Sequence, residues 1–199
     1  MQVNRYDRKN INFQSALLNI AATADNHGNV RSIPQVIKTV QENQNDIFDK
    51  SEKESTLNLF AVAGDYFMYP EKSGLLTKKD KQIGDIQFNF LARMILSVKN
   101  STAYNSKFDT VFTPGNHDLE AGDKWLYRKL TNSHMTTVMT NVNLAKSPLV
   151  KKIMKENPNI VESKIYEIPD DKNPDIINKV LVMGATIPRE KFNGKRMSG

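Results

Sequence analysis

Apolar runs typical of buried β-strands alternate along this chain with amphipathic runs typical of helices. The strand-type runs occupy 16–24, 57–63, 108–113, 135–143, 160–169 and 178–186, and the helix-type runs occupy 30–43, 83–98 and 124–130. The stretch 66–82 is typical of a long surface loop. Strands that are followed by helices pack as layered α/β folds, so we expect one α/β domain over residues 1–199, with a mainly parallel sheet in its first part.

Three of the strand-type runs end in polar motifs: DNHG at 25–28, GD at 64–65 and GNHD at 115–118. Taken alone, each motif is typical of a turn, because Gly, Asn and Asp are turn and helix-capping residues. The carboxyl ends of parallel strands share one edge of a sheet, which is where open α/β sheets bind ligands. An Asp-x-His pair offers an oxygen and an imidazole nitrogen to one ion. The order and placement of the three motifs therefore favour a metal site over coincident turns.

The composition excludes several other kinds of protein. The chain has no cysteine, so its metal ligands must be His, Asp, Glu or Asn. The net charge of +6 suits anionic ligands, but no arginine-rich stripe of the nucleic-acid-binding kind is present. No apolar run approaches the roughly 18 residues of a membrane span, and no signal-peptide core is seen. We expect no membrane binding and no specific nucleic-acid binding; a cytoplasmic location is favoured, with export left open.

In this order and strand context, DNHG, GD and GNHD resemble the D-x-H, G-D and G-N-H-D/E motifs of the calcineurin-like metallophosphoesterases. The resemblance is closest to the N-terminal half of the 5′-nucleotidase catalytic domain. In that branch the third motif is followed by an acidic residue, a glycine and a helix, as in LEAGDKWLYRKL, and later by strands similar to TTVMTNVN and VLVMGAT. The resemblance covers about 16–188. It implies β-sheets flanked by helices and a phosphoester hydrolase that acts on small phosphorylated substrates, with nucleotides as candidates.

The resemblance also implies two divalent metal ions, such as Mn, Zn or Fe, and their ligands. Asp25 and His27 would bind the first ion, Asp65 would bridge both ions, and Asn116 would bind the second ion through its amide oxygen. Two ions about 3.5–4 Å apart can lower the pKa of a bridging water and hold phosphoryl oxygens for in-line attack.

Two catalytic residues follow from the same resemblance. His117 would stabilise the developing charge or donate a proton, and Asp118 would orient the imidazole of His117. A carboxylate beside a histidine favours the protonated imidazole. GNHD, in place of GNHE, shortens this carboxylate arm by one methylene.

The chain departs from the family pattern downstream of these motifs. The family completes its site with histidines in a GH and a later GH-x-H, whereas only His134 follows His117 here. We expect His134 to be an exposed loop or helix-end residue. We also expect the chain to be the N-terminal part of a longer enzyme, weak or inactive alone, with an apolar edge and face of its sheet exposed. The alternative is a non-catalytic phosphate- or metal-binding module that lacks the distal histidines.

Aromatic residues flank two of the motifs. Tyr66, Phe67 and Tyr69 follow the second motif and could stack on a base, although packing within the loop is the more common role. On the helix after the third motif, we expect Trp125 in the core and Tyr127 on the surface.

Overall fold

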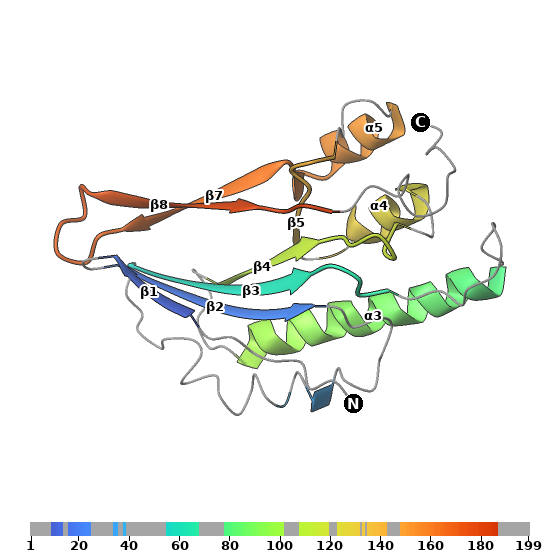
Figure 1. Cartoon of the computed structure of the whole chain (residues 1–199), viewed down its shortest axis with the longest axis horizontal. Helices are drawn as coiled ribbons and strands as arrows, with labels where there is room; N and C mark the ends of the chain where they lie inside the picture. Colours follow the sequence, from blue (N-terminus) through green and yellow to red (C-terminus); the bar gives the residue numbers. More distant parts are fainter. Residues whose placement is uncertain are drawn as a thin grey trace.

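A six-stranded sheet lies at the centre of the computed structural model of this chain (Figure 1). The structure describes residues 9–13, 16–24, 34–35, 38, 55–67, 78–101, 108–119, 123–131, 133, 135–142 and 148–186. In sheet order, the strands are β1 (Lys9–Phe13), β2 (Ala16–Ala24), β3 (Thr56–Ala63), β4 (Phe108–Thr113), β5 (Thr136–Val138) and β6 (Ile160–Val161). β1 pairs with β2 antiparallel, and every neighbouring pair from β2 to β6 is parallel. The predicted α/β fold with a mainly parallel sheet is confirmed.

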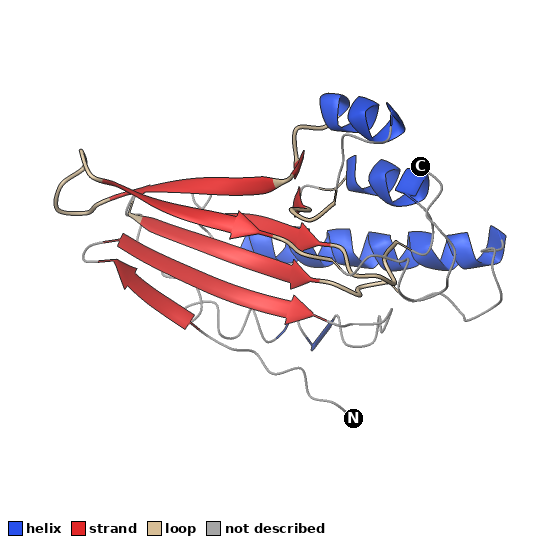
Figure 2. Ribbon diagram, turned by 45° about the horizontal axis from the view of Figure 1, so that its top comes forward, coloured by secondary structure: helices blue, strands red, loops and turns tan. Residues whose placement is uncertain are grey.

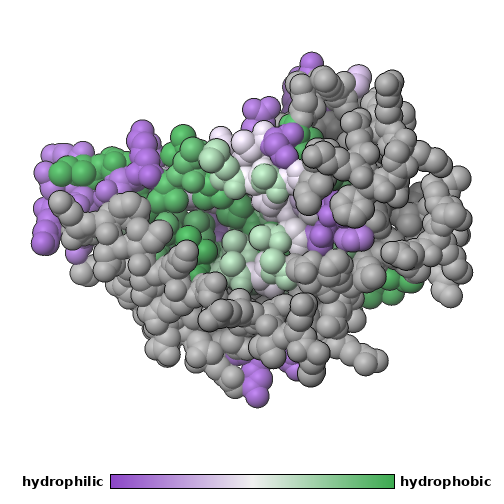
Figure 3. Space-filling view, in the orientation of Figure 1, coloured by the Kyte–Doolittle hydropathy of each residue, from purple (hydrophilic) through white to green (hydrophobic). Residues whose placement is uncertain are grey.

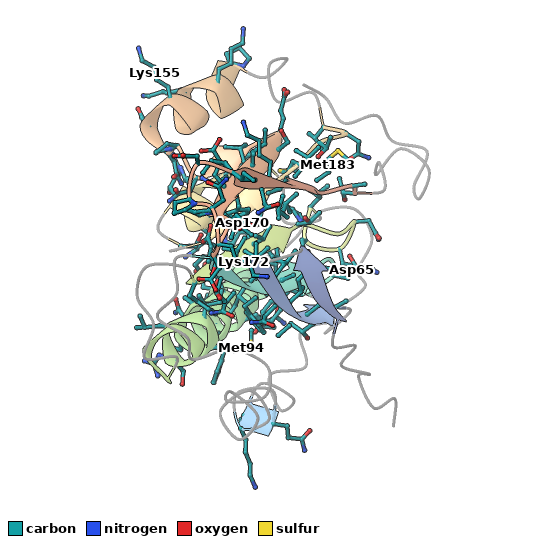
Figure 4. The ribbon with its side chains drawn as sticks, turned by 90° about the vertical axis from the view of Figure 1, so that its left-hand side faces the viewer. Asp65, Met94, Lys155, Asp170, Lys172 and Met183 are labelled. Carbon is teal, nitrogen blue, oxygen red and sulfur yellow. The ribbon has the colours of Figure 1, made fainter. Side chains whose placement is uncertain are left out.

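Helices cover one face of this sheet. Among the described residues, three helices have both ends defined: α3 (Lys78–Ser101), α4 (Asp123–Thr131) and α5 (Pro148–Glu156). α3 runs along the sheet, and α5 lies beside α4 (Figure 1). Phe60 and Val62 of β3 point to this face and join α3 and α4 in one buried cluster, to which α3 contributes the fully buried Met94 (Figure 4).

A β-hairpin covers the opposite face of the sheet. It consists of β7 (Ser163–Pro169) and β8 (Ile177–Met183), which pair antiparallel. Leu57 and Leu59 of β3 point to this face and pack in a second buried cluster with Ile168 of β7. Because successive side chains of a strand point to opposite faces, β3 is buried on both sides, which explains its continuous apolar run.

Several predicted elements have different bounds in the structure. The strand expected at 135–143 is limited to β5, and the run 160–169 is divided into β6 and β7, with Glu162 between them. The helix expected at 83–98 begins earlier and ends later, as α3. β1 and α5 had no counterpart in the predicted pattern. Of the helix expected at 30–43, the structure describes Pro34, Gln35 and Lys38, which are helical.

The outer face of the hairpin exposes apolar side chains beside the ion pair of Lys179 with Glu167. Ile165 and Leu181 pair across the two strands and are 55% and 54% exposed, and Met183 is 64% exposed. Figure 3 shows hydrophobic surface over this part of the molecule. These exposed apolar residues belong to the hairpin and not to the six-stranded sheet, whose two faces are covered by the helices and the hairpin. The expected exposed face of the main sheet and the self-association that it would favour therefore stay predictions.

A polar contact joins the hairpin to the sheet. The Tyr166 hydroxyl donates a hydrogen bond of 2.6 Å to Asp109 Oδ2 on β4, and Thr136 Oγ1 on β5 donates to the same oxygen at 3.1 Å. Asp109 Oδ1 accepts the backbone N–H of Thr110 at 2.7 Å. Burial and the hydrogen bond to Asp109 raise the pKa of Tyr166 well above its usual range.

Replacing Tyr166 with phenylalanine should lower the free energy of unfolding by about 1.5 kcal/mol at neutral pH, because a hydrogen bond to a charged group is lost. The folded chain keeps the Tyr166 proton at pH values where the unfolded chain releases it. Wild-type stability should therefore fall as the pH rises above about 10, and this contribution is absent from the Tyr166→Phe variant. Urea unfolding should show that the difference in free energy of unfolding between wild type and Tyr166→Phe is smaller at about pH 10.5 than at about pH 7. A gap of equal size at both pH values would contradict this role of Tyr166.

Candidate functional site

Three parallel strands end level at one edge of the sheet. Ala24 of β2 pairs with Ala63 of β3, and Ala63 pairs with Thr113 of β4. Figure 2 shows these central strands ending side by side. Asp25 and His27 directly follow β2 in the sequence but lie outside the described residues, as does His134, so their predicted roles stay predictions. The loops after β3 and β4 are described and carry the other predicted site residues.

The loop after β3 turns through two residues in the left-handed region, Gly64 with φ 74° and Asp65 with φ 45°. This backbone costs a non-glycine residue about 1 kcal/mol, and Asp and Asn tolerate it better than other side chains do. Gly64 N–H donates to Thr113 O at 2.8 Å, and Asp65 Oδ1 accepts His117 N–H at 3.0 Å. The Asp65 carboxylate is therefore held against the loop after β4.

Gly115 allows this close approach of the two loops. A Cβ atom at position 115 would lie 2.6 Å from Asp65 Cγ and would overlap Asp65 Oδ1 as well. A contact under about 3 Å requires a shift of the backbone or of the carboxylate. The glycine of the GNHD motif is thus explained by the position of Asp65, which the sequence alone does not reveal.

The residues after Gly115 form a turn, in which Leu119 N–H donates to Asn116 O at 3.3 Å. Asn116 and His117 are half-buried, and so is Asp65. Asp118 is completely buried. The structure therefore brings together, at one edge of the sheet, the four predicted site residues that it describes.

Asp118 belongs to the loop after β4, and its buried carboxylate binds backbone N–H groups of both loops. Its Oδ1 accepts the N–H of Phe67 at 2.7 Å, and its Oδ2 accepts the N–H of Gly115 at 2.8 Å. Burial raises the pKa of Asp118 to about 7, against the lowering effect of backbone hydrogen bonds from Phe67, Gly115 and Tyr66. The nearby charge of Asp65 raises the pKa further.

The aromatic residues after Asp65 pack in the core. Tyr66 and Phe67 are 1% and 0% exposed, and Phe67 stacks on Phe88 of α3. Among the described residues, the buried Tyr66 hydroxyl has no hydrogen-bond partner. Burial and the charge of Asp118 raise the pKa of Tyr66 above its usual range. These buried positions agree with packing, rather than base stacking, for both residues.

Of the two aromatic residues of α4, the surface prediction for Tyr127 was wrong, whereas Trp125 packs against the core but is only partly buried. Tyr127 is buried, with its hydroxyl 3.9 Å from the sulfur of Met139. Trp125 is half-buried at the rim of the core, where its Nε1–H donates to Asp85 of α3 at 3.2 Å. Lys129 Nζ pairs with the same carboxylate at 2.7 Å. Trp125 therefore lies at the rim, with its Nε1–H bound to Asp85 of α3, and the buried face of α4 extends to Tyr127.

The segment after β5 meets the segment after β8 near this edge, and the sequence analysis did not predict this contact. The Asn141 side chain donates to Thr186 O at 2.6 Å and accepts Thr186 N–H at 2.9 Å. Thr140 N–H donates to Gly184 O at 2.7 Å. A Cβ atom at Gly184 would lie 2.9 Å from Cγ2 of Thr113, the last residue of β4. The end of β8 is thus placed against the end of β4, and the signal for it was the glycine and asparagine of MGAT and TNVN.

The described part of the chain contains no cluster of three or more His, Cys, Asp or Glu side chains suited to a metal ion. It also contains no helix that is long and apolar enough to cross a membrane. Asp65 and Asn116 nevertheless offer oxygen donors at the same edge, which is the donor type that hard divalent ions prefer.

Comparison with known proteins establishes the family. The family model described as calcineurin-like phosphoesterase matches residues 18–185, so the chain belongs to the calcineurin-like phosphoesterase family. The metallophosphoesterase resemblance seen in the motifs is thereby confirmed. A search of curated proteins found no match.

Two solved structures are similar to this chain. One is a 5′-nucleotidase precursor from Thermus thermophilus, with 16% identity and a TM-score of 0.47; the match covers 86% of this chain and 29% of that one. The other is the calcineurin-like phosphoesterase YfkN from Bacillus subtilis, with 19% identity and a TM-score of 0.47; the match covers 92% of this chain and 52% of that one. The chain therefore spans about a third and about half of the length of these two proteins.

Proposed function

We propose that this chain carries part of the active site of a 5′-nucleotidase-like phosphoester hydrolase that uses two divalent metal ions. The observation that carries the proposal is the contact between Asp65 and the GNHD loop at the level ends of β3 and β4. This contact brings a carboxylate, an amide and an imidazole-bearing residue together within a member of the calcineurin-like phosphoesterase family.

The donor types support a site for Mn, Zn or Fe ions. Asp65 would contribute a carboxylate to both ions and Asn116 an amide oxygen to one, and Asp25 and His27 are the proposed ligands of the other ion. The ions would supply a water of lowered pKa and positive charge for the phosphoryl oxygens. His117 would stabilise negative charge on the substrate or donate a proton to the leaving oxygen.

Turnover of AMP and p-nitrophenyl phosphate by the whole chain in the presence of Mn²⁺ tests the proposal. We expect weak turnover that EDTA abolishes, because the proposed ligands leave both coordination shells to be completed by water. Calorimetric binding of Mn²⁺ without any turnover would select the non-catalytic binding module instead. The absence of both binding and turnover would contradict the proposed function.

A further inference from the structure

Asp118 connects the two loops that carry the proposed metal ligands. Its carboxylate is completely buried, and its oxygens accept backbone N–H groups from both loops, Phe67 at 2.7 Å and Gly115 at 2.8 Å. Phe67 lies two residues after Asp65, and Gly115 directly precedes Asn116. One side chain therefore fixes the backbone next to both proposed ligands.

The position of Asp65 depends on contacts of this kind. Asp65 has a φ of 45°, a backbone conformation that an L-residue does not favour by itself. The hydrogen bond from His117 N–H holds its side chain, and the contacts of Asp118 hold the chain that follows it. Without Asp118, the Phe67 N–H on this side of Asp65 would lose its buried hydrogen-bond acceptor.

We infer that Asp118 is a positioning residue, which sets the distance between Asp65 and Asn116 by binding the backbone of both loops. This inference rests on the proposed function, in which these two residues hold metal ions. It gives Asp118 a task that is separate from any effect on the imidazole of His117. Hydrogen-bonded residues outside the ligand set commonly change metal affinity by roughly 10–100-fold when they are replaced.

The Asp118→Asn variant tests the inference through metal affinity. The amide group replaces one acceptor oxygen with an N–H₂ group, which would face a backbone N–H, so one of the two loops loses its hydrogen bond. We expect Mn²⁺ binding by the folded variant to weaken roughly 10–100-fold in calorimetric titrations. Asp109→Asn is the matched control, since Asp109 is a hydrogen-bonded aspartate at the opposite end of β4. The affinity of this variant for Mn²⁺ should equal that of the wild-type chain.

The outcomes separate this inference from the proposed function. Unchanged Mn²⁺ affinity in Asp118→Asn, with or without a loss of turnover, would overturn the positioning role and leave the proposed function standing. An equal loss of affinity in Asp109→Asn would also overturn it, because the effect would then be general destabilisation. A wild-type chain that binds no Mn²⁺ would overturn the proposed function and this inference with it.

A measurement on the wild-type chain covers the case in which Asp118→Asn does not fold. If the Asp118 hydrogen bonds favour metal binding, then metal binding must favour these hydrogen bonds, because coupling is reciprocal. Adding Zn²⁺ should therefore slow amide exchange at Phe67 and Gly115, followed by NMR. The Thr110 amide, which binds Asp109 at 2.7 Å, is the control and should not change. Unchanged exchange at Phe67 and Gly115 in the presence of bound Zn²⁺ would overturn the inference.

Discussion

The Asp65→Asn variant should lose metal-dependent phosphoester hydrolysis by a factor on the order of 10³, one of the two largest effects that we expect from single substitutions. Asparagine tolerates the left-handed backbone at position 65, and its amide oxygen can still accept the His117 N–H. The substitution therefore removes the charge and leaves the loop in place. A carboxylate shared by two ions also screens their mutual repulsion, so its loss weakens both positions at once.

The Asp25→Asn variant is the comparison for this prediction. Asp25 is the proposed ligand of one ion only, so its replacement should lower metal affinity less than Asp65→Asn does. Thermal unfolding of both variants in EDTA shows whether the fold is retained. Effects of equal size, or negligible effects of both substitutions, would remove Asp65 from the bridging role.

The long central strands could be predicted from the sequence because they are buried on both faces. β2, β3 and β4 have apolar residues on the helix side and on the hairpin side, which gives continuous apolar runs whose ends are clear. Hydrophobicity does not show where a strand leaves one sheet for another. The division of 160–169 into β6 and β7 depends on pairing with β5 and β8, which are partners distant in the chain.

The sequence predicted which residues meet at the candidate site, because their positions depend on where the parallel strands end. Asp65 and the GNHD loop meet because Ala63 and Thr113 are paired, and the order of motifs along parallel strands contains that information. The contacts inside the site depend on the path of the loops. Asp118 accepts hydrogen bonds from the Phe67 and Gly115 N–H groups, so the loop after β3 must lie against the loop after β4. No local sequence pattern encodes this contact.

The buried faces of short helices were harder to predict than the strands. In α4, Leu126, Tyr127 and Leu130 are buried, which is consistent with a helical stripe that includes Tyr127. Trp125 lies at the margin of that stripe because α3 presents Asp85 to its Nε1–H. Residue type favours a buried Trp, but the neighbouring helix decides the outcome.

Replacing His117 with asparagine should lower turnover of AMP or p-nitrophenyl phosphate by roughly 10²–10⁴-fold while metal content stays nearly unchanged. The contact that His117 makes with Asp65 uses the backbone N–H, which every substitution except proline retains, so the position of Asp65 should be kept. The lost function is that of the side chain, which is proposed to act on the substrate in the transition state. The decrease should therefore appear in kcat more than in metal affinity.

The matched control is His134→Asn, since His134 is the remaining histidine that the sequence assigns no role at the site. Its turnover and metal content should equal those of the wild-type chain. Metal content by atomic absorption and single-turnover rates, measured on both variants at the same Mn²⁺ concentration, decide the role of His117. A loss of metal in His117→Asn would show that the imidazole is a ligand, and unchanged turnover would show that it takes no part in the reaction. A loss of activity in His134→Asn would instead assign to that histidine one of the ligand positions that the family fills further downstream.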